Sequence, residues 1–236
     1  MAGLHIQIPT TFSDNTLPVI LQDVPGPWDS RWLMQLVGAT PAASVPEVNA
    51  GQALLGGGSA SATKTVVVAT NPNGKKYARF DNAAKTPNVT TLERDVVFPT
   101  GAPAAFTILM VVDLPTNAST ALYLLSAFGL TIARQQNSNK VQIAHSPYTA
   151  TTQSVGGAGI CVVGVTRSPG ALAIWVNEAK NTMADITLGQ NKIVINPNVN
   201  NNQDWDLYET LVCDEALTDS QMNAAVAHLK TRYAIA

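Results

Sequence analysis

The sequence predicts an all-β protein of two packed antiparallel sheets, with an extended N-terminal arm and one short C-terminal helix. Three observations support this prediction. Short apolar segments recur between turn residues from Lys64 onward, and helical periodicity is nearly absent before the C-terminal region. Charged residues make up 13% of the 236 residues, about half the roughly 25% of average domains. A chain of this length can bury the core of one domain.

Residues 1–22 are expected to form the arm, because Pro9 and Pro18 bracket apolar residues at alternate positions. Residues 23–236 are expected to form a single domain. An extended arm can add a strand to a neighbouring subunit. The arm residues that we expect to drive such assembly are Leu4, Ile6, Ile8 and Phe12.

After a stretch rich in Pro, Gly and Ala, Gly56-Gly57-Gly58-Ser59 predicts a flexible connection. Roughly ten to thirteen short strands then follow, each bounded by turn residues such as those of Asn71–Gly74. One of them is apolar on both alternating sets, which is typical of a strand buried in the middle of a sandwich. The clearest expected strands are Thr65–Ala69, Tyr77–Phe80, Val96–Phe98, Phe106–Val112 (the fully apolar one), Leu122–Phe128, Thr131–Arg134, Val141–Ala144, Ile160–Thr166, Ala171–Asn177, Ile193–Ile195 and Asp206–Cys213.

One helix is expected near the end of the sequence. Thr218 can be its N-cap, Gln221 completes a capping box, and Leu217 with Met222 forms a hydrophobic staple. Charges at both ends complement the helix dipole: Asp219 near the start, Lys230 and Arg232 near the end. The residues that share its apolar face are Met222, Ala225, Val226, Leu229 and Tyr233. This face should dock on the sandwich.

Charge and hydropathy exclude several classes of function. The net charge is −2 and basic residues do not cluster beyond Lys75-Lys76, so we expect no nucleic-acid partner. Residues 1–10 lack a signal-peptide pattern and no apolar stretch approaches 18 residues, so we expect synthesis in the cytoplasm and no membrane span. Cys161 and Cys213 lie in apolar runs, which indicates reduced buried thiols.

The sequence shows no recognisable catalytic set, and we expect neither an enzyme nor a cofactor. Glycoside hydrolases on such a fold place paired carboxylates on one strand face. Glu93-Arg94-Asp95 is the nearest approach, but the third carboxylate is missing, and a solvated turn is the expected structure. The histidines are far apart in the sequence and lack the spacing of metal ligands.

A loop rich in Asn precedes Asp204-Trp205-Asp206, and Glu209 follows. Trp205 could stack on a sugar with help from Asn202 and Asp204, although a core role is the alternative for this indole. The side-chain oxygens of Asp and Asn on this loop could hold Ca²⁺. Loops rich in Asn usually supply turns, however, and no metal site is expected.

The C-terminal third resembles a known family. Ala171–Asn177, then Asp206–Ser220, then a short helix ending near Ile235 are similar to concanavalin A-like, laminin G-like jelly rolls. The likeness is best over residues 171–236 and extends loosely back to about Lys64. Asp206 and Tyr208 depart from the family's pattern, so the resemblance implies the jelly-roll fold and no ligand site.

Residues 8–18 look like the opening of tail or capsid-associated proteins of tailed bacteriophages. This resemblance implies a virion structural protein, as a capsid decoration or a tail or fibre component, whose partners are other virion proteins and copies of itself. The alternative is a carbohydrate-binding module that recognises a host surface glycan through loops near Trp205 or Trp28.

Overall fold

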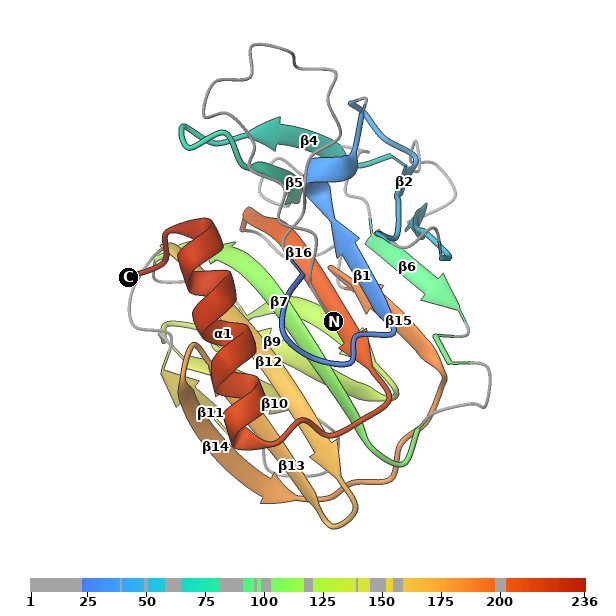
Figure 1. Cartoon of the computed structure of the whole chain (residues 1–236), viewed down its shortest axis with the longest axis vertical. Coiled ribbons are helices and arrows are strands. Elements are labelled where there is room, and N and C mark those ends of the chain that lie inside the picture. Colours follow the sequence, from blue (N-terminus) through green and yellow to red (C-terminus); the bar gives the residue numbers. More distant parts are fainter. Residues whose placement is uncertain are drawn as a thin grey trace, which may run out of the picture.

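The computed structural model describes residues 23–38, 40–48, 51–57, 65–80, 91–95, 97–98, 103–116, 121–138, 140–144, 152–154, 159–197 and 203–236. These residues form two antiparallel sheets with one helix on the outside (Figure 1). The prediction of a two-sheet β-sandwich with a short C-terminal helix is therefore confirmed. The proposed arm, with Leu4, Ile6, Ile8 and Phe12, lies outside the described residues.

The sheet that carries the helix is here called the helix-side sheet. Its strands in spatial order are β14 (Ala179–Ala184), β13 (Ala171–Val176), β12 (Gly159–Ser168), β7 (Phe106–Leu114), β16 (Trp205–Cys213), β5 (Lys76–Phe80) and β4 (Val67–Thr70). A further strand, β1 (Ser30–Leu33), also pairs with β16. Because β7 takes one edge of β16, β1 and β5 share the other edge. A 3-10 turn, η1 (Met34–Leu36), follows β1.

The second sheet is here called the far sheet. Its strands in spatial order are β11 (Thr152–Ser154), β10 (Lys140–Ala144), β9 (Leu130–Arg134), β8 (Leu122–Ala127), β15 (Lys192–Ile195), β6 (Thr91–Asp95), β3 (Leu54–Gly57) and β2 (Ser44–Val45). In the described part of the chain, all strand pairs of both sheets are antiparallel, which suits sheets that alternate buried and exposed side chains.

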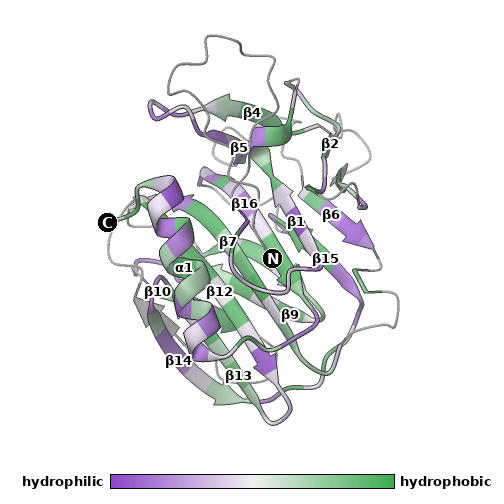
Figure 2. Cartoon of the chain, in the orientation of Figure 1, coloured by the Kyte–Doolittle hydropathy of each residue, from purple (hydrophilic) through white to green (hydrophobic). Residues whose placement is uncertain are grey.

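The helix-side sheet contributes to two cores, one on each face. Ile108 and Met110 of β7 point into the core between the sheets, whereas Leu109 and Val111 point into a second core beneath the helix. Every residue of β7 except Asp113 is buried. This double burial explains why its sequence is apolar on both alternating sets. Figure 2 shows the same contrast, with hydrophobic colours along β7 and β12 and hydrophilic colours on β14.

The helix α1 (Asp219–Tyr233) begins and packs as predicted. Thr218 Oγ1 accepts a hydrogen bond from the Gln221 N–H (3.3 Å), and the Gln221 side chain accepts from the Thr218 N–H (2.9 Å). All five residues of the predicted apolar face are buried. No helix in the described residues is long and apolar enough to cross a membrane.

A buried ionic cluster ties α1 to the N-terminal region. Glu209 on β16 has no exposed side-chain surface, and its carboxylate accepts hydrogen bonds from three groups. Arg31 Nε of β1 is one donor, Arg232 Nη1 is the second at 3.3 Å, and the Tyr233 hydroxyl is the third at 2.8 Å. We call these four residues the Glu209 cluster.

Three expectations about the early part of the chain are wrong. Gly56 and Gly57 form part of β3 and pair with β6 instead of making a flexible connection. Glu93–Asp95 belongs to β6 instead of a turn, and Lys192 of β15 lies between the two carboxylates. Val97 and Phe98, the described part of the expected strand Val96–Phe98, lie outside any strand, and the side chain of Asn191 bonds the Phe98 N–H and C=O groups instead of a neighbouring strand.

Candidate functional site

Trp205, a candidate sugar-binding residue, lies in the core between the two sheets. Its ring is 2% exposed, stacks on Phe80 with ring centroids 4.6 Å apart, and donates its N–H to Asn196 Oδ1 at 3.3 Å. The indole therefore offers no face to a ligand, and its position fits the core role considered above. Asp204 is exposed beside it, whereas Asn202 lies outside the described residues.

The acidic side chains near Trp205 do not converge on a common point. Asp206 pairs with Arg79 of β5, with an Nε to Oδ1 distance of 3.0 Å, while Glu209 is held in its own cluster under α1. Within the described ranges, no three His, Cys, Asp or Glu side chains gather closely enough to hold a metal ion. Residues 198–202 of the Asn-rich loop, on which the calcium alternative depends, lie outside the described residues.

Two carboxylates face each other across β16 and β7. Asp206 and Asp113 are direct cross-strand partners, so both point to the outer face of the helix-side sheet. Burial and the charge of Asp206 raise the pKa of Asp113. Burial also raises the pKa of Asp206, although the hydrogen bond from Arg79 opposes this shift. The pair is a polar strip whose charge the Arg79 guanidinium partly neutralises.

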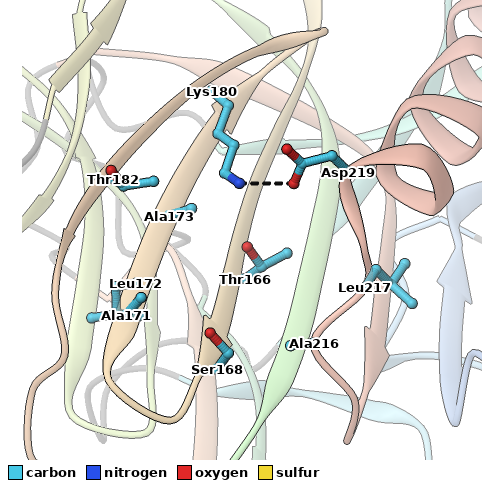
Figure 3. Close-up of a pocket in the computed structure, with 10 residues that line it drawn as sticks. All are labelled: Thr166, Ser168, Ala171, Leu172, Ala173, Lys180, Thr182, Ala216, Leu217 and Asp219. Atoms are coloured by element: carbon cyan, nitrogen blue, oxygen red, sulfur yellow. Dashed lines mark hydrogen bonds and ion pairs between the residues drawn. The ribbon is translucent and has the colours of Figure 1, made fainter.

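A groove of about 200 Å³ lies on the outer face of the helix-side sheet, where β12, β13 and β14 meet the start of α1 (Figure 3). Its floor follows from the strand register. Thr166 is opposite Ala173, Ser168 is opposite Ala171, and Ala173 is in turn opposite Thr182. Because these residues alternate along their strands, they share one face. The floor is thus a methyl surface flanked by three hydroxyl groups.

One wall of the groove is the segment that leads into α1. Ala216, Leu217 and Asp219 line it. The hydroxyl of Thr107 on β7 fixes this segment, because it donates to the Glu215 carbonyl at 2.8 Å and accepts from the Leu217 N–H at 2.9 Å. The wall is therefore attached to the centre of the sheet.

The opposite wall is β14, whose Lys180 stands at one end of the groove. Lys180 Nζ lies 2.7 Å from Asp219 Oδ1, so this ion pair spans the groove (Figure 3). The same Nζ lies 5.3 Å from the ring centre of Trp175, whose indole N–H donates to Thr166 Oγ1 at 3.2 Å. The groove thus presents hydroxyl, ammonium and carboxylate groups that can hydrogen-bond a small polar ligand.

Sequence reasoning missed the groove because its residues come from three strands and from the segment that leads into α1. Thr166 and Ala173 lie in strands that were predicted, but β14 was not, and only the register brings Thr182 and Lys180 beside them. One signal was available in Asn177, whose φ of 51° closes the short turn from β13 to β14. Asn tolerates this left-handed conformation better than most residues.

No family model matches this sequence, and no curated protein matches it. Solved structures do match. The ligand binding domain of botulinum neurotoxin serotype D, in complex with N-acetylneuraminic acid, has a TM-score of 0.59 and 10% identity, and the match covers 85% of this chain and 50% of that one. The binding domain of botulinum neurotoxin DC, in complex with rat synaptotagmin II, has a TM-score of 0.60 and 12% identity, covering 85% and 51%.

A third match is the receptor binding domain of the neurotoxin mosaic serotype C/D, with a TM-score of 0.62 and 10% identity, covering 87% of this chain and 52% of that one. The chain shares their fold. It spans about half the length of each of these domains. At such low identity the likeness shows the fold alone, a jelly-roll-like β-sandwich.

Proposed function

We propose that this chain is a non-enzymatic carbohydrate-binding module, and that the groove beside α1 holds one sugar residue of a glycan. The observation that carries the proposal is the composition of the groove, in which three hydroxyl groups and the Lys180–Asp219 pair surround a floor of two alanines. Hydroxyl, ammonium and carboxylate groups together offer both donors and acceptors to a sugar's hydroxyl groups.

The size of the groove suits one sugar ring. Its volume of about 200 Å³ is below the roughly 300–1,000 Å³ of pockets for drug-sized ligands. Ala171 and Ala173 leave the floor low, so that the ring of a monosaccharide could approach the sheet closely. The fold supports the proposal in a general way, because one protein with this fold is described in complex with N-acetylneuraminic acid.

The test is to fill the groove and to remove one of its hydroxyl groups. Ala171 and Thr182 are both exposed, so Ala171→Leu and Thr182→Val should fold normally. A glycan array followed by calorimetric titration should show saturable binding by the wild type. We expect Ala171→Leu to weaken it at least about tenfold, or about 1.4 kcal/mol, and Thr182→Val to weaken it less.

The matched control for Ala171→Leu is Ala179→Leu, since Ala179 is an exposed alanine of β14 whose side chain lies on the opposite side of that strand from Lys180 and Thr182. It should bind like the wild type. The absence of saturable binding to any glycan by the wild type would refute the proposal. Release of reducing sugar from a bound glycan would refute its non-enzymatic part.

An assembly role is a second proposal, and one observation favours it. The N-terminal segment already adds a strand within the chain, because β1 pairs with the edge of β16. Residues 1–22, which precede it, could add to another copy or to other virion proteins in the same way. Deletion of residues 1–22 should abolish such assembly in native mass measurements or particle attachment, and unchanged assembly would contradict this role.

A further inference from the structure

Trp175 lies at the end of the groove where Lys180 stands. It is on β13, directly opposite Gly164 of β12 and Lys180 of β14. Its side chain points to the outer face of the helix-side sheet, where it joins the core beneath α1, and 2% of the residue is exposed. The hydrogen bond from its N–H to Thr166 Oγ1 directs the pyrrole edge of the indole toward the groove floor.

Two weak contacts keep Lys180 over this ring. One is the cation–π contact of Nζ with the Trp175 ring, and the other is the ion pair with Asp219. The Lys180 side chain is 33% exposed and the Asp219 side chain 65% exposed. Contacts of both kinds contribute little where water reaches them, so a ligand can displace the ammonium at small cost.

We propose that Trp175 is a second glycan contact and that the Lys180–Asp219 pair is the removable part of its cover, the rest of the indole being packed in the core beneath α1. This inference rests on the proposed function and narrows it to oligosaccharides. The groove holds one sugar residue, and the next residue of the glycan stacks its apolar C–H face on the indole after Lys180 moves aside. Adjacent outward positions on a strand are roughly 7 Å apart. Trp175 is the next outward residue after Ala173 on β13, so it lies about that distance beyond the floor of the groove.

The displaced ammonium keeps hydrogen-bonding partners in the complex. Lys180 carries three donors, which can turn from Asp219 to the hydroxyl groups of the stacked sugar. Asp219 then accepts hydrogen bonds from the sugar in the groove. When Lys180 moves aside, contacts with the sugar replace the Lys180–Asp219 ion pair, and the sugar ring replaces Lys180 over the indole face.

The first experiment tests the cover without any sugar. Lys180→Ala should at least double the acrylamide quenching of the Trp175 fluorescence. That signal is isolated in the wild type by subtracting Trp175→Phe, and in Lys180→Ala by subtracting the Lys180→Ala/Trp175→Phe double variant. Raising NaCl to about 1 M, which screens exposed ion pairs, should increase quenching in the wild type and leave Lys180→Ala unchanged. Unchanged quenching in Lys180→Ala would overturn the proposal.

The second experiment tests the stacking. The protein is titrated with each of four monosaccharides and, separately, with a disaccharide that contains the same sugar. The four are glucose, galactose, N-acetylglucosamine and N-acetylneuraminic acid. The wild type should bind the preferred disaccharide about tenfold more tightly than its monosaccharide, and Trp175→Leu should abolish this ratio while keeping monosaccharide binding. Circular dichroism checks its folding, and the quenching result decides the matter if this variant does not fold.

The two proposals fail in distinguishable ways. If Ala171→Leu loses monosaccharide binding while Trp175→Leu keeps the disaccharide preference, the groove stands and the role of Trp175 is refuted. If the wild type binds none of these saccharides, the proposed function falls, and the inference falls with it.

Discussion

At the scale of single residues, Glu209 joins parts of the chain that are distant in sequence. Its carboxylate meets Arg31 from β1 and both Arg232 and Tyr233 from the end of α1. Burial, together with the neighbouring Glu209, raises the pKa of Tyr233, so this hydroxyl stays protonated and donates to the carboxylate. Because one carboxylate serves three donors, removal of its charge weakens all three contacts at once.

We expect Glu209→Gln to lower the free energy of unfolding by about 3–5 kcal/mol, since it removes the buried counter-ion that Arg31 and Arg232 share. Urea denaturation measures the change. The control is Glu178→Gln, which removes an exposed ion pair with Lys230 and should cost no more than about 1 kcal/mol. Equal effects of the two substitutions would contradict the importance of the Glu209 cluster.

Asp113 predicts a dependence of stability on pH. Its pKa is raised in the folded protein, so the folded state holds the proton more tightly than the unfolded chain, whose aspartates titrate near pH 4. The contribution of Asp113 to stability is therefore favourable at acidic pH, and it declines as the pH rises from about 4 through the raised pKa.

Asp113→Asn should remove that decline and stabilise the protein at pH 7 by about 0.2–1 kcal/mol, because it also ends a like-charge cross-strand pair with Asp206. Thermal melts of both proteins between pH 3 and pH 7 check this. A constant difference across the whole range would show that Asp113 does not titrate in the expected window.

At the scale of elements, the start of α1 is the feature that the sequence specifies most fully. We expect Thr218→Ala to cost about 1 kcal/mol, since it removes the side-chain acceptor of the Gln221 N–H. Thr218→Ser keeps the oxygen and should retain most of the stability in chemical denaturation. If the serine variant loses as much as the alanine variant, the hydroxyl is not the stabilising group.

Elements with strong local signals could be predicted, and those fixed by distant partners could not. The unbroken apolar sequence of β7 predicts a buried strand, and the capping residues of α1 predict where the helix begins. The strand β3 does not, because the absence of a side chain at Gly57 makes room for the Glu93 carboxylate and the Thr91 hydroxyl of β6. This glycine serves a close contact between strands, whereas its sequence context indicates flexibility.

The missed strands β6 and β14 have another cause. Their outward residues are charged or polar, and the residues that form ion pairs with them are distant in the sequence. Glu93 and Asp95 share Lys192 of β15, and Lys180 meets Asp219 of α1. The groove could not be predicted for the same reason, since a local pattern carries no information on register between β12, β13 and β14.

At the scale of the whole molecule, the two cores on opposite faces of the helix-side sheet each contain one cysteine. Cys161 lies in the core between the sheets and Cys213 in the core beneath α1. Burial raises the pKa of Cys161 to about 12 and that of Cys213 to about 11, so neither thiol reacts appreciably without opening of the structure.

Loosening α1 should therefore expose the two thiols at different rates. Leu229→Ala removes a fully buried side chain of the helix, at a cost of about 2–5 kcal/mol. We expect faster labelling of Cys213 by a disulfide reagent, with a smaller change at Cys161, as measured by mass spectrometry. Equal acceleration at both sites would mean that α1 detaches only when the entire sandwich unfolds.

The position of β16 has a consequence for how the protein is made. This strand pairs with β1, β5 and β7, and Arg31 and Glu209 are 178 residues apart. A ribosome that adds roughly 5–20 residues per second needs about 10–35 s to pass from one to the other. From the time each is made until β16 emerges, β1, β5 and β7 lack the partner of one edge, and an unpaired strand edge is a template for pairing with another chain.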